Sequence, residues 1–217
     1  MARRAALFDL DKTLVRVNTA ALYVRWQVRN GEARRRDFAK TLYWLGQYTL
    51  GVIDAETIVR QAARAMRGRA VDEFESKLRA WVDDEVMQHV SLSARREVER
   101  RRAAGDLCAV LTSSTTYSAV PLAEKLGIED VLANQLEEHA GIFTGEIVNP
   151  LCYGAGKVAV AEQWARERDV DLANSVFFTD SISDRPMLER VGEPVAINPD
   201  PRLRLLAWRR GWRVERW

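Results

Sequence analysis

The stretch ALFDLDKTLV, residues 6 to 15, decides the prediction of the fold. It opens with an apolar run typical of a buried strand and ends in two carboxylates, Asp9 and Asp11, two positions apart. Side chains two apart at a strand end point to the same side, so both carboxylates should reach one place. Ionised groups are costly to desolvate, and we therefore expect other parts of the chain to compensate them.

Strands and helices alternate from Ser91 onward. Helical patterns separate short runs that are typical of strands, and these runs are LCAVL (107–111), VLANQLEE (131–138), SVFFTD (175–180) and EPVAIN (193–198). A hairpin is also predicted, with its turn near residues 139–141. Alternation at this spacing predicts an α/β fold, a doubly wound parallel sheet with helices on both faces.

The segment that follows the first strand is predicted to be helical. Apolar residues recur three and four positions apart over the ranges 18–31, 35–51, 54–68 and 71–90. Asn18 or Thr19 would cap the first of these helices, and Gly31 would end it. The sequence thus predicts two modules: a core formed by residues 1–14 and 89–217, and an inserted helical cap formed by residues 15–88.

Composition narrows the class of protein. A chain of 217 residues with 47% hydrophobic residues can bury a sizeable core. Its formal net charge of +2 supplies no broad field toward nucleic acid or anionic lipid, so charged patches must be judged locally. No apolar run is long enough to span a bilayer, and we expect no integral membrane association. Cys108 and Cys152 lack metal-binding spacing and are predicted to be reduced thiols of a cytoplasmic protein.

Polar residues follow three of the predicted strands. They are Asp9 and Asp11, then Thr112 and Ser113, then Asp180 and Asp184. The carboxyl ends of parallel strands meet at one edge of the sheet, where open α/β sheets bind their ligands. We therefore expect the three pairs to face a common crevice.

These residue types favour a cation and a phosphoryl group. Two carboxylates about 4 Å apart repel by roughly 4 kcal/mol at an effective dielectric constant near 20, so they require a positive partner. Carboxylate oxygens without a His or Cys cluster favour Mg²⁺. Lys157, which opens a predicted helix, would neutralise what the metal ion does not. The Thr112 hydroxyl and the backbone N–H groups after it would donate to phosphoryl oxygens.

The same residues carry a resemblance to a known family. The series DLDKT (9–13), LTSS (111–114), Lys157 and TDSISD (179–184) resembles the four ordered motifs of the haloacid dehalogenase superfamily. The helical segment after the first motif resembles the cap of the phosphoserine phosphatase-like branch, subfamily IB. The resemblance covers most of the chain.

The resemblance implies a role for each matching position. Asp9 would attack phosphorus and become an aspartyl phosphate, and Asp11 would act as general acid and then as general base. Thr112 and Lys157 would hold the phosphoryl oxygens, with Ser113 beside them. Mg²⁺ would be bound by Asp9, the carbonyl oxygen of Asp11, and Asp180, with Asp184 orienting groups from just outside. The expected reaction is hydrolysis of a small phosphomonoester.

One position departs from the family pattern. Phosphoserine phosphatases usually carry a Glu nine residues after the nucleophile, where it recognises the substrate's ammonium group, and this chain has Asn18 there. An amide accepts a hydrogen bond but forms no ion pair, which weakens the case for phosphoserine itself. A phosphoserine-like substrate is the first prediction, and polyol, histidinol or lysolipid phosphates are the alternatives.

Other interpretations remain open. Asp9, Thr112 and Asp180 could cap helices, and the chain could be a non-catalytic regulator that binds a phosphorylated ligand. The basic run RREVERRR (95–102) includes acids at helical spacing, so we interpret it as a solvated helix face and expect no nucleic acid partner. The aromatic run 38–50 is interpreted as the underside of the cap, with a homodimer surface or a lipid-facing patch as alternatives.

Overall fold

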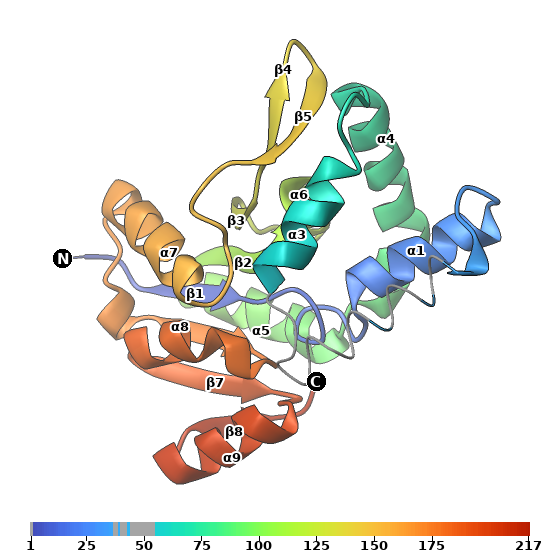
Figure 1. The fold of residues 1–217 in the computed structure, drawn as a ribbon. Helices are drawn as coiled ribbons and strands as arrows, with labels where there is room; N and C mark the ends of the chain where they lie inside the picture. The colour runs from blue at the N-terminus through green and yellow to red at the C-terminus, as the bar shows by residue number, and fades with distance from the viewer. Residues whose placement is uncertain (1, 37–38, 40–42, 44–54) are drawn as a thin grey trace.

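Six strands pair in parallel to form the central sheet (Figure 1). The structure is a computed structural model that describes residues 2–36, 39, 43 and 55–217. The strand order is β3-β2-β1-β6-β7-β8. In chain order the strands are β1 (Ala5–Phe8), β2 (Leu107–Thr115), β3 (Asp130–Asn134), β6 (Val176–Thr179), β7 (Glu193–Ile197) and β8 (Arg213–Glu215). Because β1 lies between β2 and β6, strand order reverses there, which is where a ligand crevice is expected.

Alternation along the strands gives the sheet two apolar faces. Phe8 and Phe178 stack on one face with ring centroids 4.8 Å apart, and Leu7 and Phe177 belong to the core on the other face. The first face is covered by α5 (Leu92–Ala103) and α6 (Thr116–Leu126). The second is covered by α7 (Ala155–Arg168), α8 (Arg185–Arg190) and α9 (Pro201–Arg210). The predicted doubly wound α/β fold is confirmed.

Helices dominate the described part of the segment 15–88. They are α1 (Thr19–Arg29), α3 (Ala55–Arg64), α4 (Val71–Trp81), the π-helix η1 (Val82–Val86) and the 3₁₀ helix η2 (Met87–His89). The Asn18 side chain caps α1 by accepting from the backbone N–H of Ala21, as predicted. The helix predicted over 71–90 is present, but it changes from α to π and then to 3₁₀ geometry. Of the helix predicted over 35–51, and of the aromatic run within it, most lies outside the described residues.

The predicted hairpin consists of β4 (Leu136–His139) and β5 (Ile142–Ile147), which pair antiparallel. Its turn residues Ala140 and Gly141 both have positive φ, at 50° and 75°. The hairpin also pairs with the segment before α4: Gly68 N–H donates to the Phe143 carbonyl at 2.9 Å, and Phe143 N–H donates to the Arg69 carbonyl at 3.1 Å. Figure 1 shows the hairpin beside α3 and α4. The sequence did not predict this pairing.

Some local predictions are wrong. Strand β2 extends to Thr115, with a register irregularity after Leu111, so Thr112 and Ser113 lie within the strand and not after it. Strand β8 was not predicted, because its three residues are largely exposed and carry no apolar pattern.

Two expectations about the whole chain can be compared with the structure. Both cysteines are buried free thiols, and burial raises the pKa of the Cys152 thiol to about 12. Among the described residues, no helix combines the length and the apolar character that crossing a membrane requires.

Candidate active site

A buried lysine links two buried carboxylates at the carboxyl end of the sheet. The Lys157 ammonium donates to Asp9 Oδ1 at 2.9 Å and to Asp184 Oδ2 at 2.8 Å. Asp9 follows β1, Lys157 lies in the first turn of α7, and Asp184 ends the 3₁₀ helix η4 (Ile182–Asp184). Both carboxylates and the ammonium group are nearly inaccessible to solvent. Three residues far apart in the sequence are therefore brought together, as the sequence predicted.

Two glycines place this lysine. Gly154 precedes α7 with φ of 53° and ψ of −122°, a conformation that L side chains rarely adopt. At Gly156 a Cβ atom would lie 1.9 Å from the carbonyl oxygen of Leu151, which real side chains never tolerate. The loop can therefore pack against the first turn of α7 only because position 156 is glycine, and this packing sets where Lys157 enters the site.

Asp184 is held by a second donor. The Thr179 hydroxyl, at the end of β6, donates to Asp184 Oδ2 at 2.6 Å. The other carboxylate oxygen, Oδ1, is buried without a hydrogen-bond partner among the described residues. Asp184 thus keeps one acceptor unused beside the Lys157 ammonium.

Asp11 receives three hydrogen bonds from the start of α1. Its Oδ1 accepts from the Thr19 N–H at 3.0 Å and from the Thr19 hydroxyl at 2.7 Å, and its Oδ2 accepts from the Asn18 amide at 2.9 Å. Burial raises the pKa of Asp11, and the two Thr19 hydrogen bonds oppose that increase. The helix start therefore fixes the orientation of this carboxylate.

This arrangement changes the interpretation of Asn18. Its amide nitrogen donates to Asp11, and its carbonyl oxygen accepts from the Ala21 N–H at 3.0 Å. Each end of the side chain makes one hydrogen bond within the protein, so the structure joins Asn18 to Asp11 and to the start of α1.

The second motif lies within reach of the same helix start. The Ser114 N–H donates to the buried Thr112 hydroxyl oxygen at 3.1 Å, and the Ser114 and Thr19 hydroxyls lie 3.3 Å apart. The Ser113 carbonyl accepts from the Asn134 amide at 2.7 Å, which anchors the end of β2 to β3. These contacts connect Asp11 with Thr112 through Thr19 and Ser114.

Asp180 completes the acidic side of the site. Burial and then the charge of Asp9 raise its pKa to about 8, although the Lys12 ammonium, 4.0 Å away, lowers it. The pKa of Asp9 rises to about 7, chiefly through burial and despite Lys157. Asp9 and Asp180 thus lie close together, and the nearby ammonium groups do not fully compensate their negative charge. A site of this kind favours binding of a divalent cation.

Side chains would supply only part of the oxygen ligands of a magnesium ion at this site. Within the described residues, no three His, Cys, Asp or Glu side chains gather into a metal-binding group. The predicted set needs only two side chains, Asp9 and Asp180, with the carbonyl oxygen of Asp11 as third donor. Hard oxygen donors of this kind suit Mg²⁺, which keeps several waters.

Sequence reasoning missed three hydroxyl residues of the site. Thr19 and Ser114 connect the first two motifs, and Thr179 holds Asp184. Thr19 was considered only as a helix cap, and its position beside Asn18 was the available signal. Two arginines of the helical segment have surroundings of their own: Arg60 is engaged by Glu56 and Asn149, and Arg25 lines a hollow of about 210 Å³ beside Trp26 and His89.

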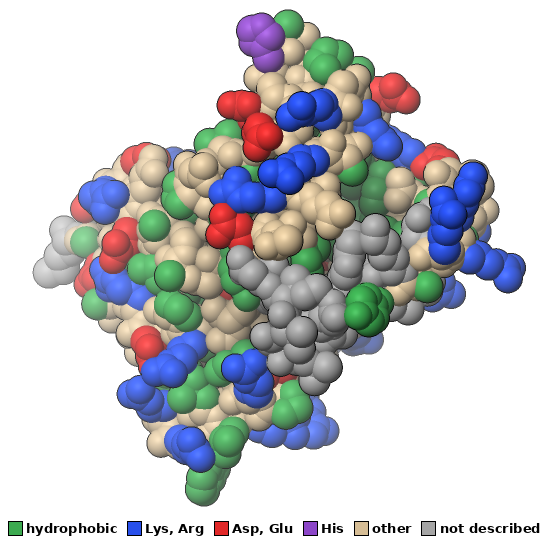
Figure 2. All heavy atoms as spheres, in the orientation of Figure 1, with side chains coloured by type: hydrophobic (Ala, Val, Ile, Leu, Met, Phe, Trp, Pro, Cys, Tyr) green, Lys and Arg blue, Asp and Glu red, His purple; other side chains and the backbone are tan. Residues whose placement is uncertain are grey.

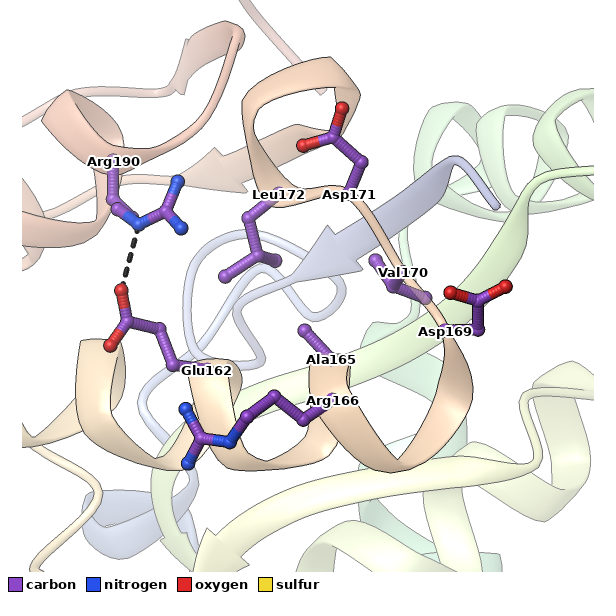
Figure 3. A pocket seen from close by; sticks show the side chains of 8 residues that line it. All are labelled: Glu162, Ala165, Arg166, Asp169, Val170, Asp171, Leu172 and Arg190. Atoms are coloured by element: carbon purple, nitrogen blue, oxygen red, sulfur yellow. Dashed lines mark hydrogen bonds and ion pairs between the residues drawn. The ribbon is translucent and has the colours of Figure 1, made fainter. Parts of the chain in front are cut away.

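A larger hollow of about 420 Å³ lies at the opposite end of the sheet (Figure 3). Residues 169–172 form one wall and precede β6, whereas Asp180 follows that strand. Arg190 and Glu162 form an ion pair at 2.9 Å on the other wall. None of the predicted site residues lines this hollow, and ligands of open α/β sheets bind at the carboxyl ends.

Comparison with known proteins agrees with this geometry. A family model for haloacid dehalogenase-like hydrolases matches residues 6–189. The chain is 31% identical to phosphoserine phosphatase SerB1 of Mycobacterium tuberculosis over 97% of its own length and 70% of that protein's. It is 27% identical to a histidinol-phosphatase of Neisseria meningitidis, covering 98% of each.

A solved structure has the same fold over the full length. The crystal structure of a Bordetella pertussis protein of unknown function superposes with a TM-score of 0.89 and 30% identity, covering 99% of each chain. The motifs, their convergence at the carboxyl ends of the strands and these relatives lead to one conclusion: the chain is a hydrolase that belongs to the haloacid dehalogenase-like family.

Proposed function

We propose that the protein is a Mg²⁺-dependent phosphatase that hydrolyses a small phosphomonoester. The observation that carries the proposal is the buried Lys157 ammonium, 2.9 Å from Asp9 Oδ1, in a site whose other carboxylates repel one another. A cation that contacts a nucleophilic carboxylate can also contact the phosphoryl oxygens that approach it. The relatives named as phosphatases support the same reaction.

The proposed reaction proceeds in two displacements. A carboxylate oxygen of Asp9 attacks phosphorus, and the bond to the alcohol oxygen breaks as Asp11 donates its proton to that oxygen. Water then attacks the aspartyl phosphate and transfers a proton to Asp11, which releases inorganic phosphate and restores both carboxyl groups. The raised pKa of Asp11 suits a group that must be protonated in the first step.

The remaining side chains stabilise charge on the phosphoryl group. Lys157 would contact its oxygens, and the Thr112 hydroxyl would donate to them, because a hydroxyl that accepts from the Ser114 N–H still has a proton to give. Bound by Asp9, Asp180 and the carbonyl oxygen of Asp11, Mg²⁺ would neutralise these carboxylates and the phosphoryl oxygens. Asp184 would keep Lys157 in place.

The substrate is proposed to be phosphoserine or a similar small phosphate. One relative is named phosphoserine phosphatase and another histidinol-phosphatase, so both substrate types stay in the proposal. Asn18 is a neutral amide that contacts Asp11 and Ala21, so it would supply no ion pair to a substrate ammonium group. A panel that includes phosphoserine, histidinol phosphate, polyol phosphates and a lysolipid phosphate, assayed for phosphate release, ranks these candidates.

The residues 15–88 are proposed to form the cap that selects the substrate and limits access of water. A homodimer and a cytoplasmic location remain predictions as well. Cap selectivity favours metabolites over nucleic acids or folded proteins as substrates.

The central test compares wild type with Asp9→Asn on an aryl phosphate in the presence of Mg²⁺. Removing the nucleophile should lower kcat by at least about 1,000-fold, because no other group can form the intermediate. Asp72→Asn, on the exposed start of α4, is the control and should retain wild-type turnover. A well-folded wild type without turnover would instead favour the phospho-ligand-binding regulator.

A further inference from the structure

Helix α9 presents a face that is both basic and apolar. Leu203 and Ala207 are fully buried against the sheet, so the opposite side of the helix points to solvent. That side, which we call the α9 face, consists of Arg202, Arg204, Leu205, Trp208 and Arg209. Trp208 is 78% exposed and Leu205 is 49% exposed.

The positive charge of this face is not neutralised within the described residues. Arg202, Arg204 and Arg209 form no ion pair there, and the neighbouring acids have other partners. Asp200 caps the helix by accepting from the N–H groups of Arg202 and Leu203 at 2.8 Å. Glu189 pairs with Arg185 and Arg210, and Glu215 pairs with Arg213. Figure 2 shows blue and green side chains together over α9, at the foot of the molecule.

The α9 face is also rigid. Asp200 fixes the start of the helix, Gly211 ends it in the left-handed conformation with φ of 66°, and the buried side anchors it to β7 and β8. Trp208 therefore projects from a preformed helix and does not need to become ordered on binding. Preorganisation lowers the entropic cost of association.

We propose that the α9 face binds the surface of membranes that contain anionic lipids. Tryptophan and leucine flanked by arginines are the composition of helices that lie in the membrane interface, with the rings among the headgroups and the guanidinium groups on phosphates. The interleaved apolar side chains favour a lipid surface over nucleic acid, where exposed Leu205 would gain nothing. Peripheral binding of this kind does not require a membrane-spanning helix.

The proposal goes beyond the phosphatase function and does not depend on it. The α9 face contributes none of the catalytic residues, which lie at the ends of β1 and β6, within β2 and at the start of α7. Docking through α9 would hold the enzyme at the membrane and leave its chemistry unchanged. Turnover of a soluble aryl phosphate can therefore report folding separately from membrane binding.

The test is co-sedimentation of the full chain with two kinds of vesicle, one of phosphatidylcholine alone and one that also contains about 30% phosphatidylglycerol. The salt concentration is about 0.05 M, so that screening of charges is weak. Wild type should bind the anionic vesicles, bind neutral vesicles at least tenfold less, and dissociate near 0.5 M salt. Arg204→Gln with Arg209→Gln should weaken binding about 25-fold, or about fivefold per arginine. Trp208→Ala should weaken it about tenfold.

Matched controls make the result specific. Arg96→Gln with Arg166→Gln removes the same charge from exposed positions on α5 and α7, and Leu92→Ala shortens a side chain that is 65% exposed. These variants should bind like wild type. Wild type that ignores anionic vesicles at low salt overturns the proposal. An equal loss of vesicle binding in the double variant Arg96→Gln with Arg166→Gln also overturns it. So does binding to duplex DNA or RNA in place of vesicles, or a dimer that dissociates when Trp208 is changed to Ala.

Discussion

At the scale of single residues, Asp11 depends on the helix that begins beside it. Burial raises its pKa, and the Thr19 N–H and hydroxyl oppose that effect by donating to the same oxygen. A carboxyl group that serves as acid and then as base needs a pKa between the values suited to each role. The start of α1 thus tunes the proton transfer of the proposed reaction.

Thr19→Val removes one of these donors while keeping the shape of the side chain. The pKa of Asp11 should rise further, because a hydrogen bond that stabilises the charged form is lost. The alkaline limb of the kcat/KM profile should therefore move to higher pH. Thr144→Val, on the exposed hairpin, should leave the profile unchanged. A drop in rate without any shift of the limb would mean that Thr19 only supports the fold.

Asp9 and Asp180 make the stability of the metal-free protein depend on pH. Their pKa values, about 7 and about 8, lie above the ordinary 3.8. The folded protein therefore keeps protons that the unfolded chain releases, so stability should fall as pH rises from about 4 to about 8 and then level off. Lys157 stays protonated throughout this window because its pKa is raised.

Asp180→Asn should remove part of this pH dependence. In metal-free buffer at pH 8 its Tm should exceed that of wild type by about 4 °C, and at pH 4 the two should agree. Added Mg²⁺ should raise the Tm of wild type at pH 8 and leave the variant nearly unaffected. Thermal unfolding followed by circular dichroism measures both effects, and a variant that is less stable than wild type at pH 8 would refute the argument.

At the scale of elements, the start of α7 tolerates no side chain at position 156. Gly156→Ala would place a Cβ atom against the Leu151 carbonyl oxygen, so either the loop or the helix must move. We expect a loss of about 2 kcal/mol or more in the free energy of unfolding, together with a large drop in kcat as Lys157 is displaced. Gly31→Ala is the comparison: it has open space and only the strain of its φ of 74°, so it should cost about 1 kcal/mol with normal kcat.

The elements also show what sequence patterns can predict. Strands β1, β6 and β7 are short apolar runs bounded by polar residues, and Asp9, Lys157 and Asp184 were expected together because they lie at the ends of such runs or open a helix. Strand β2 continues through polar residues because its partner β3 supplies hydrogen bonds there. The local sequence of β2 does not reveal which strand will pair with it. The hydrogen bond from Asn18 to Asp11 was missed for a related reason. The sequence indicates that Asn18 can cap a helix, but it does not show which carboxylate lies beside the amide nitrogen.

At the scale of the whole molecule, the hairpin and the helical segment share a core. Phe143 is 1% exposed and packs edge-to-face against Phe74 and Tyr117, with ring centroids 5.6 and 5.3 Å away. The other buried members of this cluster are Leu136, Ile147, Ala63 and Val71. Because its members come from distant parts of the chain, periodicity along the sequence could not predict it.

Phe143→Ala should loosen this shared core. We expect a cost of about 3–5 kcal/mol in the free energy of unfolding, and faster hydrogen exchange at the Gly68 and Val71 amides, which donate to hairpin carbonyls. Ile142→Ala alters the neighbouring side chain, which is 41% exposed, and should cost less than about 1 kcal/mol. Unchanged exchange at Gly68 and Val71 in the Phe143 variant would show that the pairing does not depend on this ring.

The pairing of residues 68–71 with the hairpin bears on how the proposed cap could be exchanged between relatives. A chimera that exchanged only residues 15–88 would replace Phe74, which packs against Phe143, and the segment 68–71, whose backbone pairs with the hairpin. Grafting the helices together with residues 136–147 keeps the Phe74–Phe143 contact and the backbone pairing within the transferred part. The part to be exchanged therefore consists of two separate segments, 15–88 and 136–147. A graft of residues 15–88 alone should yield insoluble protein.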